Sequence, residues 1–321
     1  MSTAAPDTRA LRSDLAALVA GGRASDDAAD RVAYARDLWP RQQIATRAGI
    51  AAVAPPAVVV WPSDANEVAA VIRYAKERSI PVVPFGAGSG VCGGILPTPD
   101  TIIIDSKRMR ALRELDADRL TCRVEAGMIG QHLEDALEQR GLTLGHFPSS
   151  IHCSTVGGWL AARSAGQCSG RYGKIEDMVL GLTCVDGTGE VFRAERDGDN
   201  AALLPLVIGS EGILAVITEA TLRIAPAPRQ RRFASYDFPS VESGVEAIRH
   251  IYQSELRPAV ARLYDPFDSM LKRSVKRSSK GRAKELVAPA WSSKAKELGM
   301  RALVHALRRP ALVNDLIEWI P

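Results

Sequence analysis

Apolar residues recur along the chain with two spacings, one typical of helices and one typical of strands. Between Val68 and Ala75 they stand three or four residues apart after the capping residue Asp64, which predicts a helix. Two short apolar runs, residues 81–85 and 101–105, predict buried strands. Helices that alternate with strands indicate sheets covered by helices.

The same alternation continues further along the chain. A strand is expected to end near Gly127, and a helix over residues 131–140 is expected to stop at Gly141, a residue that favours helix C-termini. A glycine turn at 209–212 then leads into an apolar strand over 214–219. These elements extend the mixed pattern to about residue 225.

Beyond residue 228 the pattern changes after a proline-rich and basic linker. A strand over 233–238, a helix over 241–254 and a strand over 259–264 are predicted. The expected organisation is an N-terminal helical arm over 1–50, a first domain over 51–228 with subdomains at about 51–112 and 113–228, and a partial cap domain over 229–321.

Two glycine-rich segments, residues 84–90 and 154–158, suggest phosphate binding, because small residues let backbone N–H groups approach phosphate oxygens. The first lies between two predicted strands. This argues against a Rossmann site, whose motif opens a helix, and no Gly-Lys-Ser/Thr closes a Walker loop. Taken alone, residues 84–90 fit a tight turn equally well. The hydroxyl-rich second segment favours a cofactor with a diphosphate and a polyol chain.

Composition sets wider bounds. The 321 residues are 46% hydrophobic with a net charge of +4, so they can bury a large core and do not by themselves indicate nucleic-acid binding. The basic run over 272–284 reads as an exposed loop in preference to a peripheral membrane contact. The five cysteines and five histidines show no metal-binding spacing, so no metal is expected. The odd cysteine count and the lack of a signal-peptide pattern favour a cytoplasmic location.

The order of four motifs carries a resemblance to a known family. Val-Glu-Ala-Gly at 124–127, Ser-Thr-Val-Gly-Gly-Trp at 154–159, Arg-Tyr-Gly-Lys-Ile-Glu-Asp at 171–177 and Gly-Ser-Glu-Gly at 209–212 occur in that order. This resembles the FAD-linked oxidases of the vanillyl-alcohol oxidase and p-cresol methylhydroxylase (PCMH) superfamily, and within it most closely the alkyldihydroxyacetonephosphate synthases. The resemblance implies an α+β fold, with a PCMH-type FAD-binding domain of two α/β subdomains followed by an incomplete α+β cap domain.

The resemblance also implies cofactor contacts in four segments that hold the diphosphate, the ribityl chain and the adenosine half. The residues that it assigns to FAD are Pro84, Phe85, Gly86, Ala87, Gly88, Ser89, Gly90, Ser149, Ser150, His152, Ser154, Thr155, Gly158, Ala162, Arg163, Ser164, Ala165, Glu211, Gly212 and Ile217. The FAD is expected to be non-covalent. Ser89 stands where some relatives carry the attached histidine, and no histidine occurs before His132.

Function is left among three alternatives. The resemblance to the synthases implies chemistry at flavin N5 on a hydroxy- or acyloxy-substituted small substrate such as acyl-dihydroxyacetone phosphate. A 2-hydroxy acid dehydrogenase flavin subunit is the second alternative, and a flavin-binding fragment without its acid or base is the third. Arg262 is the candidate contact for a substrate anion. The chain resembles a C-terminally truncated relative, so a homodimer or a completing C-terminal polypeptide is considered as a partner.

Overall fold

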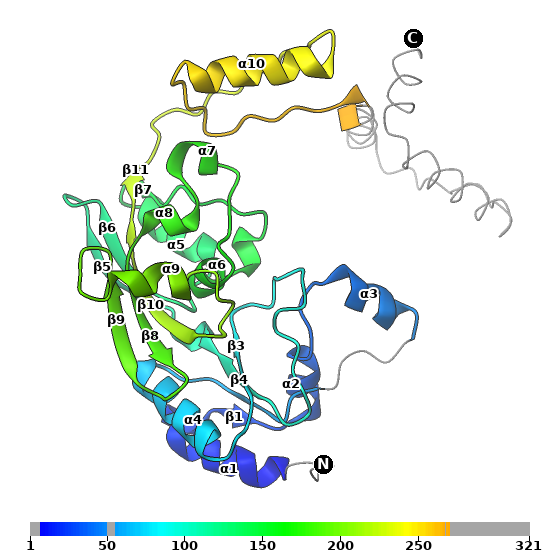
Figure 1. The fold of residues 1–321 in the computed structure, drawn as a ribbon, viewed down its shortest axis with the longest axis vertical. Coiled ribbons are helices and arrows are strands. Elements are labelled where there is room, and N and C mark those ends of the chain that lie inside the picture. Colours follow the sequence, from blue (N-terminus) through cyan, green and yellow to red (C-terminus); the bar gives the residue numbers. More distant parts are fainter. Residues whose placement is uncertain (1–6, 50–54, 267, 270–321) are drawn as a thin grey trace, which may run out of the picture. The chain divides into compact units, whose positions relative to one another are not determined.

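The computed structural model describes residues 7–49, 55–266 and 268–269, which divide into two compact units that part between Arg232 and Phe233 (Figure 1). Each unit is described by itself. The basic run at 272–284 and the rest of the expected cap domain beyond residue 269 lie outside the described residues.

The first unit contains a four-stranded sheet that is mostly parallel. Its strands, in spatial order, are β1 (Ala24–Ser25), β2 (Val58–Val60), β4 (Ile102–Asp105) and β3 (Val82–Phe85). β2, β4 and β3 run parallel, and β1 pairs antiparallel with β2. Every residue of β2 and β4 is buried, because apolar side chains pack on both faces of the sheet. The strands predicted at 81–85 and 101–105 are confirmed.

The helices that accompany this sheet in the sequence come from the N-terminal segment and from the predicted 67–75 region. They are α1 (Thr8–Leu18), α2 (Ala28–Ala33), α3 (Pro40–Arg47) and α4 (Ala65–Glu77). α4 starts where expected, since the Asp64 carboxylate accepts hydrogen bonds from the N–H groups of Asn66 (2.8 Å) and Glu67 (2.9 Å). α1 and α4 bury their apolar stripes in one core with β2 and β4. The segment expected as a helical arm therefore adds a strand and a helix to this layer.

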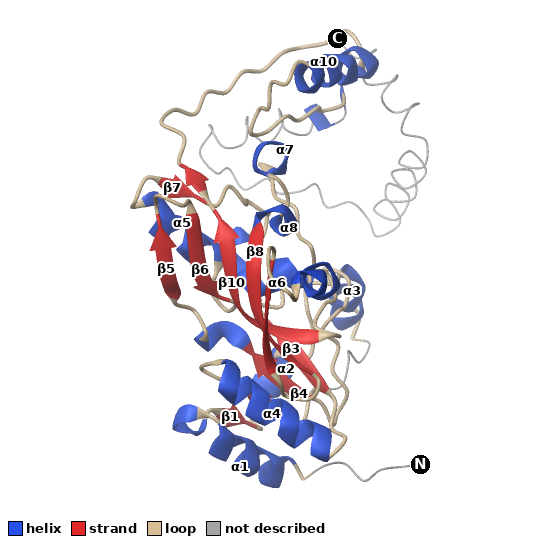
Figure 2. Ribbon diagram, turned by 60° about the vertical axis from the view of Figure 1, so that its left-hand side comes forward, coloured by secondary structure: helices blue, strands red, loops and turns tan. Residues whose placement is uncertain are grey.

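A second, antiparallel sheet follows in the same unit. Its strands, in spatial order, are β5 (Leu112–Asp116), β6 (Thr121–Glu125), β10 (Ala215–Arg223), β8 (Val179–Asp186) and β9 (Val191–Glu195). A two-stranded piece pairs β7 (Leu142–Thr143) with β11 (Ala225–Pro226). The helices of this part are α5 (Gly130–Glu138), α6 (Val156–Ala161), α7 (Ser169–Tyr172), α8 (Ile175–Met178) and α9 (Leu204–Val207). In Figure 2 the strands fan out beside α5, α6 and α8, with which they share one core.

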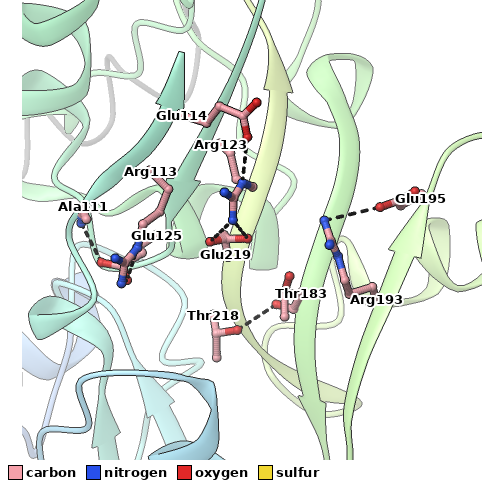
Figure 3. Close-up of polar contacts among 10 residues, drawn as sticks. All are labelled: Ala111, Arg113, Glu114, Arg123, Glu125, Thr183, Arg193, Glu195, Thr218 and Glu219. Carbon is pink, nitrogen blue, oxygen red and sulfur yellow. Dashed lines mark hydrogen bonds and ion pairs between the residues drawn. The ribbon is translucent and has the colours of Figure 1, made fainter. Parts of the chain in front are cut away.

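The strand register of the second sheet shifts at three places, and Figure 3 shows polar contacts around two of these β-bulges. In β5 the register shifts between Leu112 and Glu114, and the Glu125 carboxylate accepts hydrogen bonds from the Ala111 N–H and the extra residue Arg113. In β10 the extra residue is Thr218, whose hydroxyl donates to the Thr183 carbonyl at 3.0 Å. Side chains thus take up backbone groups that the ladder leaves unpaired.

The second unit contains α10 (Val241–Gln253), which confirms the predicted helix. The strands predicted at 233–238 and 259–264 are wrong, because neither segment pairs with another described strand. Both instead pack on the helix at Gly244, where an added Cβ would lie 2.6 Å from Leu263 and 3.4 Å from Phe238. An apolar run without a hydrogen-bonding neighbour does not form a strand.

The described residues confirm the α+β class expected from the sequence. Among these residues, none of the helices has the length and apolar character needed to cross a membrane.

Candidate functional site

The first glycine segment, residues 84–90, leaves β3 and passes directly beside the second. A Cβ added to Gly86 would lie 2.5 Å from the Thr155 Oγ1, so a larger residue would displace that side chain. Gly88 has a φ of +66°, and a Cβ there would lie 2.7 Å from the Phe85 ring. The two glycine-rich segments, which are about sixty-five residues apart in the sequence, are therefore neighbours in space.

The backbone amides of the first segment are available to a ligand. Within residues 7–49, 55–266 and 268–269, the N–H groups of Ala87, Gly88, Ser89 and Gly90 donate no hydrogen bond to another protein group. Successive unpaired amides in a tight loop attract anions. This loop has the geometry and the donors to hold a phosphate group.

Hydroxyl groups of the second segment are largely engaged within the protein. Ser154 is buried, donates to the Ser150 carbonyl at 2.8 Å and accepts from the Trp159 indole at 2.7 Å. Thr155 caps α6 by accepting the Gly158 N–H at 3.2 Å. Ser149 and His152 are exposed, as is Gly158. Ser154 and Thr155 thus fix the shape of the segment, while the exposed residues Ser149, His152 and Gly158 form its solvent-facing surface.

The third segment, residues 209–215, closes on the first from the side of β10. A Cβ added to Gly212, which has a φ of +83°, would lie 2.9 Å from the Pro84 ring. The Glu211 carboxylate lies beside Gly94, where an added Cβ would be 2.8 Å from its Oε2. Two sheets therefore meet at these turns, and the predicted cofactor residues Pro84, Gly86, Thr155 and Gly212 come together.

A pocket of about 250 Å³ opens where the first and third segments meet. Its lining combines Pro84 and Gly212 with apolar side chains of α4 and β3, among them Ile72 and Val82. Ile217 lies further along β10, with its side chain buried in the core of the second sheet. A ring with one apolar face would fit such a lining.

Arg163 turns out to hold the third segment in place. Its guanidinium donates to the carbonyls of Pro205 (2.6 Å) and Ile208 (2.8 Å), and its backbone φ is +48°. A Cβ added to Gly209 would lie 2.4 Å from its Nε. The neighbouring Ala162 and Ala165 are exposed. The arginine therefore links two of the predicted cofactor segments through backbone contacts.

His146 is buried beneath the segment that the sequence linked to the flavin. Its Nε2 lies 2.8 Å from the Ser164 Oγ, and its ring meets Trp159 edge-on with a centroid separation of 4.8 Å. Burial lowers the pKa of His146 from 6.5 to about 4, although the carboxylate of Glu176 acts in the opposite direction. The imidazole is therefore neutral at pH 7 and serves as a fixed hydrogen-bonding group to Ser164.

Arg262 belongs to the second unit and is exposed there. Its proposed contact with a substrate anion stays a prediction. Among the described residues, no group of His, Cys, Asp and Glu side chains has the arrangement of a metal site.

Two residues that the sequence did not single out support the first glycine segment. The Lys107 ammonium donates to the Gly86 carbonyl at 2.9 Å. The buried Asp37 carboxylate accepts the Gly93 N–H at 2.8 Å and lies beside Gly90. Neither has a sequence signal, because each is far along the chain from the glycines that it contacts.

Comparison with protein families gives two matches. A family model described as an FAD binding domain matches residues 56–195, and a model described as the C-terminal domain of FAD linked oxidases matches residues 227–303. The first match contains both glycine-rich segments.

Comparison with individual proteins gives similar chains in several organisms. The chain is 37% identical over 218 residues to alkyldihydroxyacetonephosphate synthase of Caenorhabditis elegans, covering 65% of this chain and 36% of that protein. It is 34% identical to D-lactate dehydrogenase of Archaeoglobus fulgidus, covering 63% of this chain and 46% of that protein. A solved structure of alkyldihydroxyacetonephosphate synthase superposes with a TM-score of 0.76 at 31% identity, covering 86% of this chain and 52% of the other. The chain thus spans about half the length of these relatives or less.

Proposed function

The chain belongs to the FAD-linked oxidase family, and from that premise we propose that its first unit binds FAD non-covalently and serves chemistry like that of the alkyldihydroxyacetonephosphate synthases. The observation that carries the proposal is the meeting of three glycine-containing turns at one place. Gly86 abuts Thr155, Gly212 abuts Pro84, and the amides between Ala87 and Gly90 have no protein partner among the described residues.

These residues fit a diphosphate-bearing cofactor. A side chain at Gly86 would collide with Thr155, since an added Cβ would lie 2.5 Å from its Oγ1, so only glycine lets the loop with the free amides lie against the second segment. We assign the diphosphate to residues 86–90 and the adenosine half to the pocket beside Pro84 and Gly212. Non-covalent binding is proposed because Ser89 occupies the position of the attached histidine in some relatives.

When bound, FAD supplies an electron-accepting ring, and the protein supplies position and electrostatics. Ser154 and Thr155 hold the second segment in its capped shape, so the exposed atoms at its surface keep a fixed direction. Neutral His146 restrains the Ser164 hydroxyl without adding charge beneath the segment. Arg163 connects residues 162–165 to the third glycine segment, because its guanidinium donates to the carbonyls of Pro205 in α9 and of Ile208, which follows α9.

The preferred substrate class is an acyloxy ketone phosphate, in keeping with the similarity to synthases from C. elegans and Dictyostelium discoideum, which are 37% and 33% identical to the chain. A 2-hydroxy acid is the second candidate. It is favoured by the 34% identity to D-lactate dehydrogenase and by the 29% identity to glycolate oxidase subunit GlcD of Bacillus subtilis.

Cofactor binding is tested by titrating the purified apoprotein with FAD and following flavin fluorescence. Gly86→Val is expected to weaken FAD binding by about 10-fold or more, because overpacking a tight contact typically costs about 1–3 kcal/mol. Gly198→Ala is the matched control, since an added Cβ there meets only ordinary contacts at 3.4 Å or more. A wild-type chain that takes up no FAD refutes the proposal, and flavin that stays with the protein after acid precipitation refutes non-covalent binding.

Substrate class is tested on the FAD-loaded chain with two assays. Exchange of labelled fatty acid into acyl-dihydroxyacetone phosphate is expected for synthase-like chemistry. Anaerobic bleaching of the flavin by 2-hydroxy acids, without such exchange, favours the second candidate. Neither reaction in a chain that binds FAD would favour a flavin-binding module that needs further polypeptide.

A further inference from the structure

The end of β4 places a lysine under the first glycine segment. The Lys107 Nζ donates to the Gly86 carbonyl at 2.9 Å and to the Asp105 Oδ2 at 2.5 Å. It also lies 5.0 Å from the centre of the Phe85 ring. Its ammonium therefore joins the edge strand β3 and its glycine turn to the neighbouring strand β4.

Asp105 provides a fixed anchor for this ammonium. Its carboxylate is fully buried, and its Oδ1 accepts the Lys107 N–H at 2.7 Å. Its Oδ2 accepts hydrogen bonds from the Trp61 indole at 3.1 Å and from the Tyr34 hydroxyl. Burial of the phenol raises the pKa of Tyr34, and the nearby Asp105 carboxylate raises it further. A carboxylate held by this many donors cannot change position without breaking several of them.

The contact with Gly86 determines which way the loop amides point. In a planar trans peptide, the carbonyl and the N–H of the next residue point in opposite directions. A Gly86 carbonyl held on Lys107 therefore aims the Ala87 N–H away from Lys107. That N–H belongs to the set of amides without a protein partner among the described residues. The same hydrogen bond keeps a carbonyl oxygen, which would repel a phosphate, out of the loop.

We propose that Lys107 is a positioning residue that presets the 86–90 loop for a diphosphate by holding the Gly86 carbonyl on the buried Asp105 anchor. The inference rests on the proposed binding of FAD and names the residue that prepares the site. Since Asp105 balances the charge of Lys107, the effect acts through loop orientation more than through attraction between Lys107 and the phosphates.

The experiment measures FAD and ADP affinities of the full chain, with ADP reporting on the diphosphate-binding half alone. Lys107→Met is expected to weaken both ligands by about 10- to 100-fold, the usual range for losing one hydrogen bond to a charged group. The double variant Asp105→Asn/Lys107→Met removes both charges together, which avoids leaving an unpaired buried carboxylate, and is expected to show the same loss. Lys107→Arg is expected to recover part of the affinity.

Lys174→Met is the matched control, because Lys174 also pairs with a carboxylate, that of Glu176, and is exposed. It should bind both ligands like the wild type. The proposal is overturned if the double variant folds with a wild-type melting temperature and binds FAD and ADP within about twofold of the wild type. A wild-type chain that binds neither ligand instead removes the proposed function on which the inference rests.

Discussion

Buried polar side chains in the first unit differ in how completely their atoms are paired. Asp105 uses both carboxylate oxygens, whereas the Nδ1 of His146 has no partner among the described residues. A buried imidazole with one nitrogen unpaired resists protonation, since a second N–H would need an acceptor. The sequence alone could not show that the His146 ring is buried against Trp159, because the two residues are thirteen positions apart.

The pKa of His146 predicts a specific pH dependence of stability. A histidine whose pKa is lowered by folding, here from 6.5 to about 4, favours the folded state while it is neutral. Its contribution is complete above pH 6.5 and falls as the pH drops toward 4, by up to about 3 kcal/mol at about 1.4 kcal/mol per pKa unit. Urea unfolding at a series of pH values is expected to show that His146→Gln flattens this part of the curve.

His152→Gln is the control for this measurement, because His152 is exposed in the same segment. It should leave the pH dependence unchanged. Identical slopes for wild type and His146→Gln between pH 4 and pH 6.5 would contradict the burial of His146.

Elements were predicted well where their signal is local. The cap at Asp64 and the apolar stripe of α4 lie within one stretch of sequence, and the glycine turn before β10 directly precedes its apolar run. Elements that depend on partners were not predictable in this way. Residues 233–238 and 259–264 carry strand-like residues but have no neighbouring strand in the part of the chain that the structure describes. Lys107 reaches Gly86 only because β3 and β4 are adjacent.

The bulge at Thr218 gives a test of one such element. Thr218→Val keeps the shape of the side chain but removes the 3.0 Å hydrogen bond to the Thr183 carbonyl inside the second sheet. The free energy of unfolding is expected to fall by about 1 kcal/mol, as measured by chemical denaturation.

Thr121→Val on the neighbouring strand β6 is the matched control, with an expected change within about 0.5 kcal/mol, because Thr121 is half-buried and lies at no register shift. A loss of equal size in both variants would show that the bulge contact contributes nothing of its own.

At the scale of the whole molecule, the three buried core clusters of the first unit are complete before the chain reaches the second. Their last members are Ile224, Val216 and Ile103. The two-stranded piece β7–β11 ends at Pro226, and the Ala227 N–H donates to the Gly141 carbonyl. Among the described residues, none of the residues in these three clusters lies in the second unit.

A chain that stops at residue 232 is therefore expected to fold cooperatively and to bind FAD as tightly as the full chain. Circular dichroism melting and FAD titration of the two proteins provide the measurement. A shortened chain that unfolds without a cooperative transition, or that loses its affinity for FAD, would show that the second unit is needed for the first.

The close approach of Gly212 to Pro84 and of Gly86 to Thr155 has a consequence for unfolding. These contacts join turns of the parallel sheet to turns packed on the antiparallel one, so a ligand seated among them touches both. Such a ligand acts as a thermodynamic cross-link, because neither sheet can unfold without releasing it. At 100 times its dissociation constant it would add about 2.7 kcal/mol to the stability of both sheets together. The melting temperature of the first unit is therefore expected to rise when FAD is added.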